Sequence, residues 1–430
     1  MIRLLKLLLL LVLLSLPFRA FAQQGAYEIT AKGGNKLQLA APPARNLGSG
    51  SGADMGKEIA DIIIFDTSLA GIFSVSPPSN SGSDNGIRPG EFPFAPWRNA
   101  GVDLLVKSGF ALSGDNLTVE FRLYNVPQER ELAAKRYSGK RADLRRIAHT
   151  FADEILLVLT GERGPFTGKI AYVTAASGNK ELAVMDYDGY NVQRLTKNGS
   201  INLNPDFSPN GRELIYTSYK KGNPDLYRRE IFSGAEVRTS HFTGLNATAS
   251  WSPDGSRIAL ALSKDGNSQI YTLGRDGKNP VRLTKNSAID VSPSWSPDGG
   301  RLAFVSDRLG KPQVFLMNAD GSNQRRLTSN GAYNVSPRWS PKGDRIAYCR
   351  QMGGGFQIFT INPDGSGDAQ LTSEGSNEHP RWSPDGRFLT FSSNRGGREA
   401  IYVMRSDGTG QTRVSRESGK DTHPTWSPRW

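Results

Sequence analysis

From residue 167 onward, short apolar runs alternate with polar turns at a regular interval. Runs such as 257–262 and 301–305 are almost continuously apolar, which is typical of strands that are covered on both faces. Each run follows a tetrapeptide such as Ser-Pro-Asp-Gly at 252–255, whose proline and glycine suit the second and fourth positions of a type I turn. An Asp-Gly pair later in the unit predicts a hairpin into a further strand, so one unit holds four strands.

This unit occurs six times. Its aromatic residue stands at Phe207, Trp251, Trp295, Trp339, Trp382 and Trp426, with spacings of 44, 44, 44, 43 and 44 residues. That period suits a four-stranded propeller blade and is too long for a leucine-rich or ankyrin repeat. The sequence therefore predicts an all-β six-bladed β-propeller over residues 167–430.

The two ends of the repeat region complement each other. Residues 169–174, 181–186 and 192–196 supply the second, third and fourth strands of a first blade, yet nothing before them resembles the inner strand with its aromatic residue. That strand stands at residues 422–426. We expect the C-terminal strand to complete the first blade and close the ring, because closure removes the open sheet edges.

Residues 23–162 lack this period and are typical of an α/β domain. Residues 117–124 alternate between apolar and polar, which predicts a half-buried strand. An apolar stripe at helical spacing predicts a helix over 142–159: Leu144, Ile147, Phe151, Ile155 and Val158. A second helix is expected over Ala53–Ala70, with Gly71 as its stop. The fold class is thus a two-domain protein, an N-terminal α/β domain followed by the propeller.

The first 22 residues have the order of a cleavable secretory signal. Two basic residues precede an apolar run over 7–14, and small residues follow at Ala20 and Ala22. The mature chain is expected to begin near Gln23. No later stretch approaches the roughly 20 apolar residues that a membrane helix needs, so stable membrane insertion is not expected.

Composition adds two limits. Cys349 is the only cysteine, so no disulfide can form within this exported chain and burial alone must hold its domains together. The formal net charge is +12, which falls to +9 once the three basic residues of the signal are removed. Basic residues recur singly through the repeats, which favours a solvated basic surface and argues against a nucleic-acid site.

Every repeat carries Asn or Asp five residues before its aromatic position: Asn202, Asn246, Asp290, Asn334, Asn377 and Asp421. In a closed propeller we expect these six residues to form a ring near one mouth of the channel. Two interpretations remain open. Each side chain can cap the entry to the inner strand through an Asx turn, or the ring can be a polar collar that meets a partner or a hard cation such as calcium.

The histidines define no firm site. His379 and His423 stand three residues before the tryptophan in adjacent repeats, where they can bind a metal, sense pH or fill a polar rim. No third ligand is evident, so neither a metal site nor a cofactor is predicted. His149 is expected at the surface or boundary of its helix, and His241 is isolated.

Several stretches carry a resemblance to a known family. They are Tyr-Glu-Ile-Thr at 27–30, Gly-Val-Asp-Leu-Leu-Val at 101–106, Phe-Arg-Leu-Tyr-Asn-Val at 121–126, Leu-Arg-Arg-Ile-Ala-His-Thr-Phe-Ala-Asp-Glu-Ile at 144–155 and Leu-Thr-Gly-Glu-Arg-Gly-Pro-Phe at 159–166. With the six Trp-Ser-Pro copies, they make the chain resemble the TolB family, the periplasmic component of the Tol-Pal envelope system. The junction over 144–166 is the more specific part, because peptidase propellers use the same repeat.

The resemblance implies a monomeric periplasmic protein that binds partners at two ends. The channel face is expected to dock the lipoprotein Pal through Asn202, Asn246, Thr248, Asp290, Ser292, Asn334, Ser336, Asn377, His379, Asp421 and His423. The mature N-terminus is expected to be a flexible strap that binds TolA as an added strand, through Gln23, Gln24, Gly25, Ala26, Tyr27, Glu28, Ile29 and Thr30. The family role implies support of outer-membrane integrity and of envelope constriction at division, with room for other envelope partners.

A rival interpretation is the propeller domain of a secreted peptidase-like or carbohydrate-active enzyme. The sequence has no Gly-x-Ser-x-Gly nucleophile elbow, which disfavours a serine hydrolase. We therefore expect no catalytic activity. The two interpretations differ in whether the protein captures Pal from an envelope extract or reacts with a serine-directed fluorophosphonate.

Overall fold

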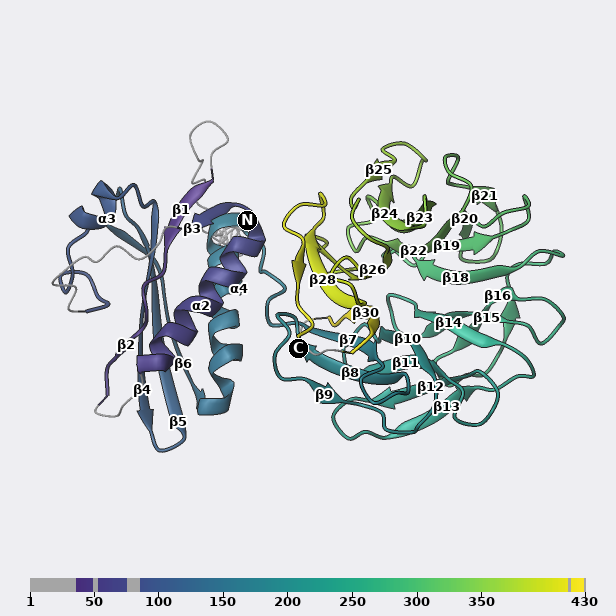
Figure 1. The fold of residues 1–430 in the computed structure, drawn as a ribbon, viewed down its shortest axis with the longest axis horizontal. Helices are drawn as coiled ribbons and strands as arrows, with labels where there is room; N and C mark the ends of the chain where they lie inside the picture. Colours follow the sequence, from purple (N-terminus) through teal and green to yellow (C-terminus); the bar gives the residue numbers. More distant parts are fainter. Residues whose placement is uncertain (1–35, 49–52, 76–85, 417–418, 429–430) are drawn as a thin grey trace, which may run out of the picture.

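The computed structural model describes residues 36–48, 53–75, 86–416 and 419–428 (Figure 1). Two domains lie side by side, one a sheet with helices and the other a ring of sheets. The predicted signal over 1–22 and the predicted strap over 23–30 lie outside the described residues. Within the described ranges, no helix has the length and apolar character needed to cross a membrane.

The N-terminal domain is a six-stranded sheet with two long helices against it. Its elements are β1 (Leu37–Ala40), β2 (Arg45–Asn46), α2 (Ala53–Ala70), β3 (Phe73–Val75), α3 (Ala95–Asn99), β4 (Leu104–Ser113), β5 (Asn116–Asn125), β6 (Arg130–Lys140), a 3-10 turn (Arg141–Asp143) and α4 (Leu144–Thr160). The strand order is β3-β1-β4-β5-β6, with β2 paired to β4. Figure 1 shows α2 and α4 between this sheet and the propeller.

Helix α4 packs as its sequence pattern predicts. Four residues of the apolar stripe are buried: Leu144, Ile147, Phe151 and Ile155. The ring of Phe151 stacks on that of Phe121 in β5, with 4.5 Å between centroids. Gly161 ends the helix at a φ of 77°, a left-handed conformation that glycine adopts without the strain of a Cβ atom. The predicted helix over Ala53–Ala70 is confirmed as α2, and the strand predicted over 117–124 lies within β5.

The propeller consists of six four-stranded antiparallel sheets, five of them built from consecutive strands. These five blades are β10 (Asn202–Phe207), β11 (Glu213–Ser218), β12 (Asp225–Glu230) and β13 (Glu236–Ser240); β14 (Asn246–Trp251), β15 (Arg257–Leu262), β16 (Gln269–Gly274) and β17 (Val281–Arg282); β18 (Asp290–Trp295), β19 (Arg301–Ser306), β20 (Gln313–Asn318) and β21 (Arg325–Arg326); β22 (Asn334–Trp339), β23 (Ile346–Met352), β24 (Gly355–Ile361) and β25 (Ala369–Gln370); and β26 (Asn377–Trp382), β27 (Phe388–Ser393), β28 (Ala400–Arg405) and β29 (Thr412–Arg413). The remaining sheet has the order β30-β7-β8-β9, from β30 (Asp421–Trp426), β7 (Lys169–Thr174), β8 (Glu181–Asp186) and β9 (Gln193–Arg194).

The C-terminal strand closes the ring, as the sequence predicts. β30 pairs with β7, so that Asp421 lies opposite Thr174 and Trp426 lies opposite Ile170. The first and last segments of the propeller therefore share one blade.

Neighbouring blades are joined by contacts between arginine and tryptophan. The guanidinium carbon of Arg257 lies 4.7 Å from the ring centroid of Trp295, and that of Arg301 lies 4.8 Å from the ring of Trp339. In each case the tryptophan belongs to the next blade, so the repeat carries its own cation–π contact between blades.

A continuous apolar core joins the two domains. Phe166, which follows α4, lies with its ring 5.4 Å from that of Tyr187 and 6.0 Å from that of Phe388. The ring of Tyr187 also stacks on Trp426 at 5.9 Å. These side chains belong to the same buried cluster as residues of α2 and α4, so the domains pack against each other directly.

Candidate functional site

Each inner strand of the propeller contains a β-bulge. In β14 the register with β15 shifts between Ala247 and Ser250, and the other five inner strands shift at the same place. The residue three places before the aromatic position has a φ between 51° and 56° in every blade: Asn204, Thr248, Ser292, Ser336, His379 and His423. Such a backbone is uncommon outside glycine and costs free energy, so all six blades are strained at one equivalent residue.

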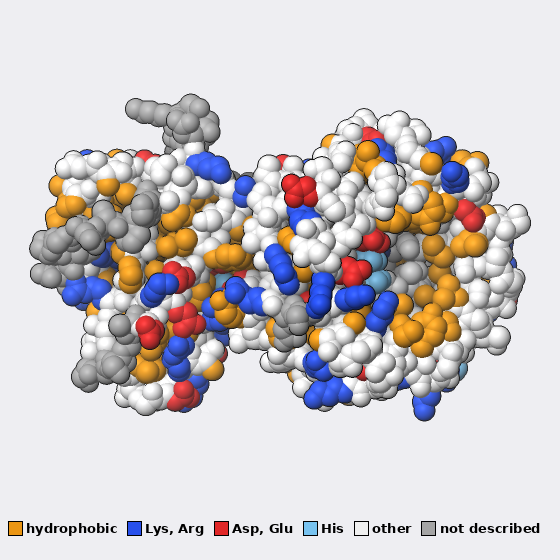
Figure 2. All heavy atoms as spheres, in the orientation of Figure 1, with side chains coloured by type: hydrophobic (Ala, Val, Ile, Leu, Met, Phe, Trp, Pro, Cys, Tyr) orange, Lys and Arg blue, Asp and Glu red, His pale blue; other side chains and the backbone are white. Residues whose placement is uncertain are grey.

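The six bulged residues share one chamber of the channel. The chamber has a volume of about 170 Å³ and is lined by these six side chains with Arg338, Arg381 and Pro424. Five of the six were predicted on the channel face, and Asn204 was not. Figure 2 shows histidine side chains in the central hollow of the propeller, with hydrophobic side chains on one side of it and basic side chains on the other.

The two histidines of the chamber stack on each other. The ring centroids of His379 and His423 lie 3.7 Å apart. Burial lowers the pKa of His379 to about 3, and the positive charges of Arg338 and Arg381 act in the same direction. Burial and the neighbouring His379 ring hold the pKa of His423 well below its usual value. Both rings are therefore neutral at physiological pH. Across the described residues, no three His, Cys, Asp or Glu side chains are grouped to hold a metal ion.

The predicted collar of Asn and Asp side chains requires a correction. All six have no exposed surface: Asn202, Asn246, Asp290, Asn334, Asn377 and Asp421. In Asn246, Oδ1 accepts from the N–H of Phe242 at 3.0 Å and Nδ2 donates to the carbonyl of Phe242 at 2.7 Å. Asn334 donates in the same way to the carbonyl of Asn330 at 2.9 Å. Asn246 and Asn334 therefore hold the loop before the inner strand, which is the turn-capping interpretation, and none of the six lines the chamber.

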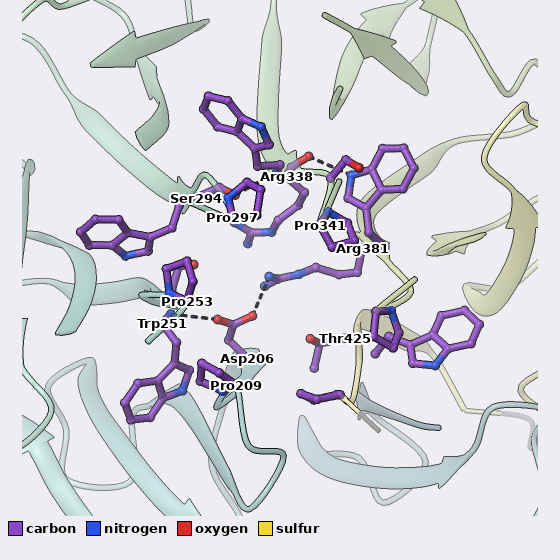
Figure 3. A pocket seen from close by; sticks show the side chains of 18 of the residues that line it. Asp206, Pro209, Trp251, Pro253, Ser294, Pro297, Arg338, Pro341, Arg381 and Thr425 are labelled. Carbon is purple, nitrogen blue, oxygen red and sulfur yellow. Dashed lines mark hydrogen bonds and ion pairs between the residues drawn. The ribbon is translucent and has the colours of Figure 1, made fainter. Parts of the chain in front are cut away.

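A second ring of channel residues lies directly before the aromatic position: Asp206, Ser250, Ser294, Arg338, Arg381 and Thr425. They line a wider cavity of about 370 Å³ at the mouth formed by the Ser-Pro turns (Figure 3). The sequence prediction missed this ring. A signal was present, because three repeats carry a charged side chain where the other three carry Ser or Thr.

One of the two arginines in this ring is paired across the channel. Arg381 donates from Nη1 to Oδ1 of Asp206 at 2.7 Å. The Oδ2 atom of Asp206 accepts from the backbone N–H of Trp251 at 3.1 Å. The carboxylate is thus fixed by a neighbouring blade and neutralises Arg381 (Figure 3).

Arg338 has no such carboxylate. Its Nη1 atom donates to the carbonyl oxygens of Pro293 and Pro337, at 3.3 Å each, and no ion pair joins it to another described residue. Burial lowers the pKa of Arg338 to about 9, and the positive charge of Arg381 adds to this effect. Because both arginines line the chamber and the wider cavity, they stand between the two parts of the channel.

His149 lies at the domain junction and is only 2% exposed, so its predicted place at the surface or boundary of its helix is wrong. Its ring lies between the carboxylates of Asp66 in α2 and Asp188 in the propeller. Arg145 also pairs with Asp188, and the hydroxyl of Tyr187 donates to Asp66. The cluster joins both long helices of the first domain to the first blade.

Comparison with known protein families gives two matches. The family described as "TolB beta propeller domain" matches residues 157–430, and the family described as "TolB amino-terminal domain" matches residues 26–132. Relatives from Geobacter sulfurreducens and Geobacter metallireducens, both named "Tol-Pal system protein TolB", are 66% and 64% identical over 208 and 214 residues. These alignments cover 48% and 50% of either chain, so the chain spans about half the length of the curated relatives it matches.

Solved structures extend the likeness to both domains. TolB from Acinetobacter baumannii aligns with 92% of this chain and 97% of its own, at 25% identity and a TM-score of 0.81. The nidogen/laminin complex aligns with 61% of this chain and 99% of that one, at 11% identity and a TM-score of 0.52, which shows the propeller fold alone.

Proposed function

The chain belongs to the TolB family, and from this premise we propose that it is a periplasmic protein-binding scaffold of the Tol-Pal envelope system. The observation that carries the proposal is the channel chamber, where six blades each place one side chain from a strained bulge. Strain that recurs at equivalent positions is typical of functional sites. The chamber offers hydroxyl, amide and neutral imidazole groups, which suit recognition of a docked surface.

Pal is the proposed partner of the channel face. The proposed contacts are the chamber residues Thr248, Ser292, Ser336, His379 and His423, and Asn204 joins them as the sixth equivalent position. Buried residues such as Asn246 and Asn334 would act on this surface only indirectly, by fixing the loops before the inner strands.

TolA is the proposed partner of the mature N-terminus. Residues 23–30 are proposed to add a strand to the edge of a TolA sheet, which depends on backbone groups more than on particular side chains. Through these two partners the protein is proposed to support outer-membrane integrity and envelope constriction at division.

The role is proposed to be binding and not catalysis. The one histidine of the chamber that contacts a serine is His379, whose Nδ1 atom lies 3.1 Å from Oγ of Ser392. That hydroxyl is buried and donates its proton to the carbonyl of Glu378 at 3.1 Å. A serine held in this way is neither exposed nor activated by its histidine, since its proton points elsewhere.

The test is a titration of Pal against the purified protein and two bulky variants. Ser336→Tyr fills the chamber and is expected to abolish Pal binding, while Ala369→Tyr adds the same bulk on an exposed outer strand and is expected to leave the affinity within a factor of about two. Deletion of residues 23–30 is expected to abolish TolA binding and to keep Pal binding. Reaction of the wild type with a serine-directed fluorophosphonate, without Pal binding, would overturn the proposal.

A further inference from the structure

The chamber at the bulges contains positive charge and no carboxylate. Its lining consists of the six bulged side chains, two guanidinium groups and one proline. Asp206, which neutralises Arg381, lines only the wider cavity on the other side of the arginines. An anion that enters the chamber therefore meets no like charge from its lining.

The positive charge of Arg338 is only partly compensated, because the carboxylate of Asp206 acts on it at a distance and forms no ion pair with it. Its guanidinium is partly buried in the channel, and its two hydrogen bonds go to backbone carbonyl oxygens through Nη1 alone. Burial of an unpaired charge is unfavourable, and the guanidinium keeps further N–H donors in a planar fork that matches two oxygens of one anion. An oxyanion bound in the chamber would therefore offset the unfavourable free energy of burying the charge of Arg338.

The rest of the lining suits the same ligand. Thr248, Ser292 and Ser336 carry hydroxyl groups that can donate to an anion, and the neutral imidazole of His423 can present one N–H. The single N–H of His379 is used at Ser392, because that hydroxyl donates its own proton to Glu378. A volume of about 170 Å³ admits a small group such as a carboxylate at the end of a side chain, and excludes a folded element. Charge-assisted bonds of this kind are the strong ones in protein recognition.

We propose that the chamber is an oxyanion site, with Arg338 as its principal ligand, and that it receives a carboxylate of the protein docked on the chamber side of the channel. The oxyanion chemistry follows from the chamber itself. The origin of the carboxylate rests on the proposed function, because it requires a partner docked at the chamber residues. A free inorganic oxyanion is the competing source.

The first experiment tests the site with sodium sulfate, by isothermal titration in low-salt buffer at pH 7.5. The variant Arg338→Gln removes the charge, and Arg194→Gln removes an equal charge from the exposed outer strand β9. The wild type and Arg194→Gln are expected to bind one sulfate per chain, and Arg338→Gln is expected to bind it at least about tenfold more weakly. Equal binding by all three proteins, or no binding by any of them, would overturn the oxyanion site.

The second experiment tests the source, with Pal titrated against the same three proteins. Two results together support a carboxylate from the partner. Pal binds Arg338→Gln at least about tenfold more weakly than it binds the other two proteins, and sulfate competes with Pal for the wild type. Unchanged Pal affinity for Arg338→Gln, beside clear sulfate binding, overturns the partner as the source and assigns the chamber to a free ion. Absence of Pal binding by the wild type refutes the proposed function and the partner carboxylate, while the sulfate result still decides the site. Thermal melting of each variant verifies that it is folded.

Discussion

The Nδ1 atom of His149 lies 2.8 Å from the Oδ2 atom of Asp66, in a junction that excludes solvent from both side chains. The Nε2 atom of the same ring lies 3.2 Å from Oδ2 of Asp188, so the imidazole stands between two carboxylates from different domains. Burial alone lowers the pKa of His149, but the charge of Asp66 and the hydrogen bond to Asp188 outweigh burial and raise that pKa to about 10. The ring is therefore a buried imidazolium that ties the first domain to the propeller.

The first prediction concerns the pH dependence of this contact. The folded pKa of about 10 lies above the usual value of 6.5, so the contribution of His149 to stability is complete below pH 6.5 and is lost as the pH rises through 10. His149→Gln is expected to lower the free energy of unfolding by about 3 kcal/mol at pH 7. Chemical denaturation between pH 6 and pH 10.5 measures the difference, which should shrink as the pH rises.

The exposed His241 provides the control. His241→Gln is expected to change the free energy of unfolding by less than about 0.5 kcal/mol at any of these pH values. A cost of His149→Gln that stays constant from pH 6 to pH 10.5 would show that the ring acts through packing and not through its charge.

The second prediction concerns closure of the ring. Removal of residues 421–430 deletes β30, which leaves β7 as an open edge and removes Trp426 from the core that joins the domains. We expect the single cooperative melting transition of the propeller to be lost. Trp295→Ala is the matched control, because it removes a buried tryptophan from a blade of consecutive strands; it is expected to cost about 4 kcal/mol and to keep one transition. A sharp transition in the truncated protein would contradict the role of β30.

The closure of the ring could be predicted from the sequence, because the repeats recur at a nearly constant spacing and only the first blade lacks an inner strand before its other strands.

The residues that line the channel were predicted wrongly in part, because the inner strands are not regular. In a regular strand, the residues five, three and one places before the tryptophan share a face. The bulge between Ala247 and Ser250, and its counterparts, break that alternation, so Asn246 lies inside the blade while Thr248 lies in the channel.

The junction around His149 escaped prediction for a different reason. The helical period of α4 shows which face is apolar, but it carries no information about what lies opposite the polar edge. Asp66 and Asp188 lie on other elements, far away in sequence, and only the packing of the domains brings them to the imidazole. Contacts of this kind depend on tertiary structure, which a periodic pattern in one element does not encode.

The third prediction concerns the strain in the bulges. Ser336 has a φ of 55°, and Asn204 has a φ of 53° at the equivalent position. Asparagine tolerates the left-handed region better than serine, so Ser336→Asn is expected to raise the free energy of unfolding by up to about 1 kcal/mol. The reverse change, Asn204→Ser, is expected to lower it by a similar amount. Urea denaturation measures both, and a loss of stability in Ser336→Asn would mean that the chamber has no room for the amide.

The last prediction concerns the ion pair across the channel. Asp206→Asn keeps an oxygen that can accept from the N–H of Trp251, but it leaves both Arg381 and Arg338 without a nearby negative charge. Arg381→Met leaves the partly buried carboxylate of Asp206 without its ion-pair partner, yet still close enough to Arg338 for its charge to raise the pKa of that guanidinium. Asp206→Asn is therefore expected to be the more destabilising of the two changes, by about 1 kcal/mol.

A double-mutant cycle on the free energy of unfolding isolates the pair. The two changes together are expected to cost less than the sum of the single changes, with a coupling energy of about 2 kcal/mol. The control cycle combines Asp206→Asn with Arg194→Gln on the exposed strand β9, where the effects should add because the two sites share no contact. Equal coupling in both cycles would indicate a general effect of net charge, and the pair would then have no special part in holding the blades of Asp206 and Arg381 together.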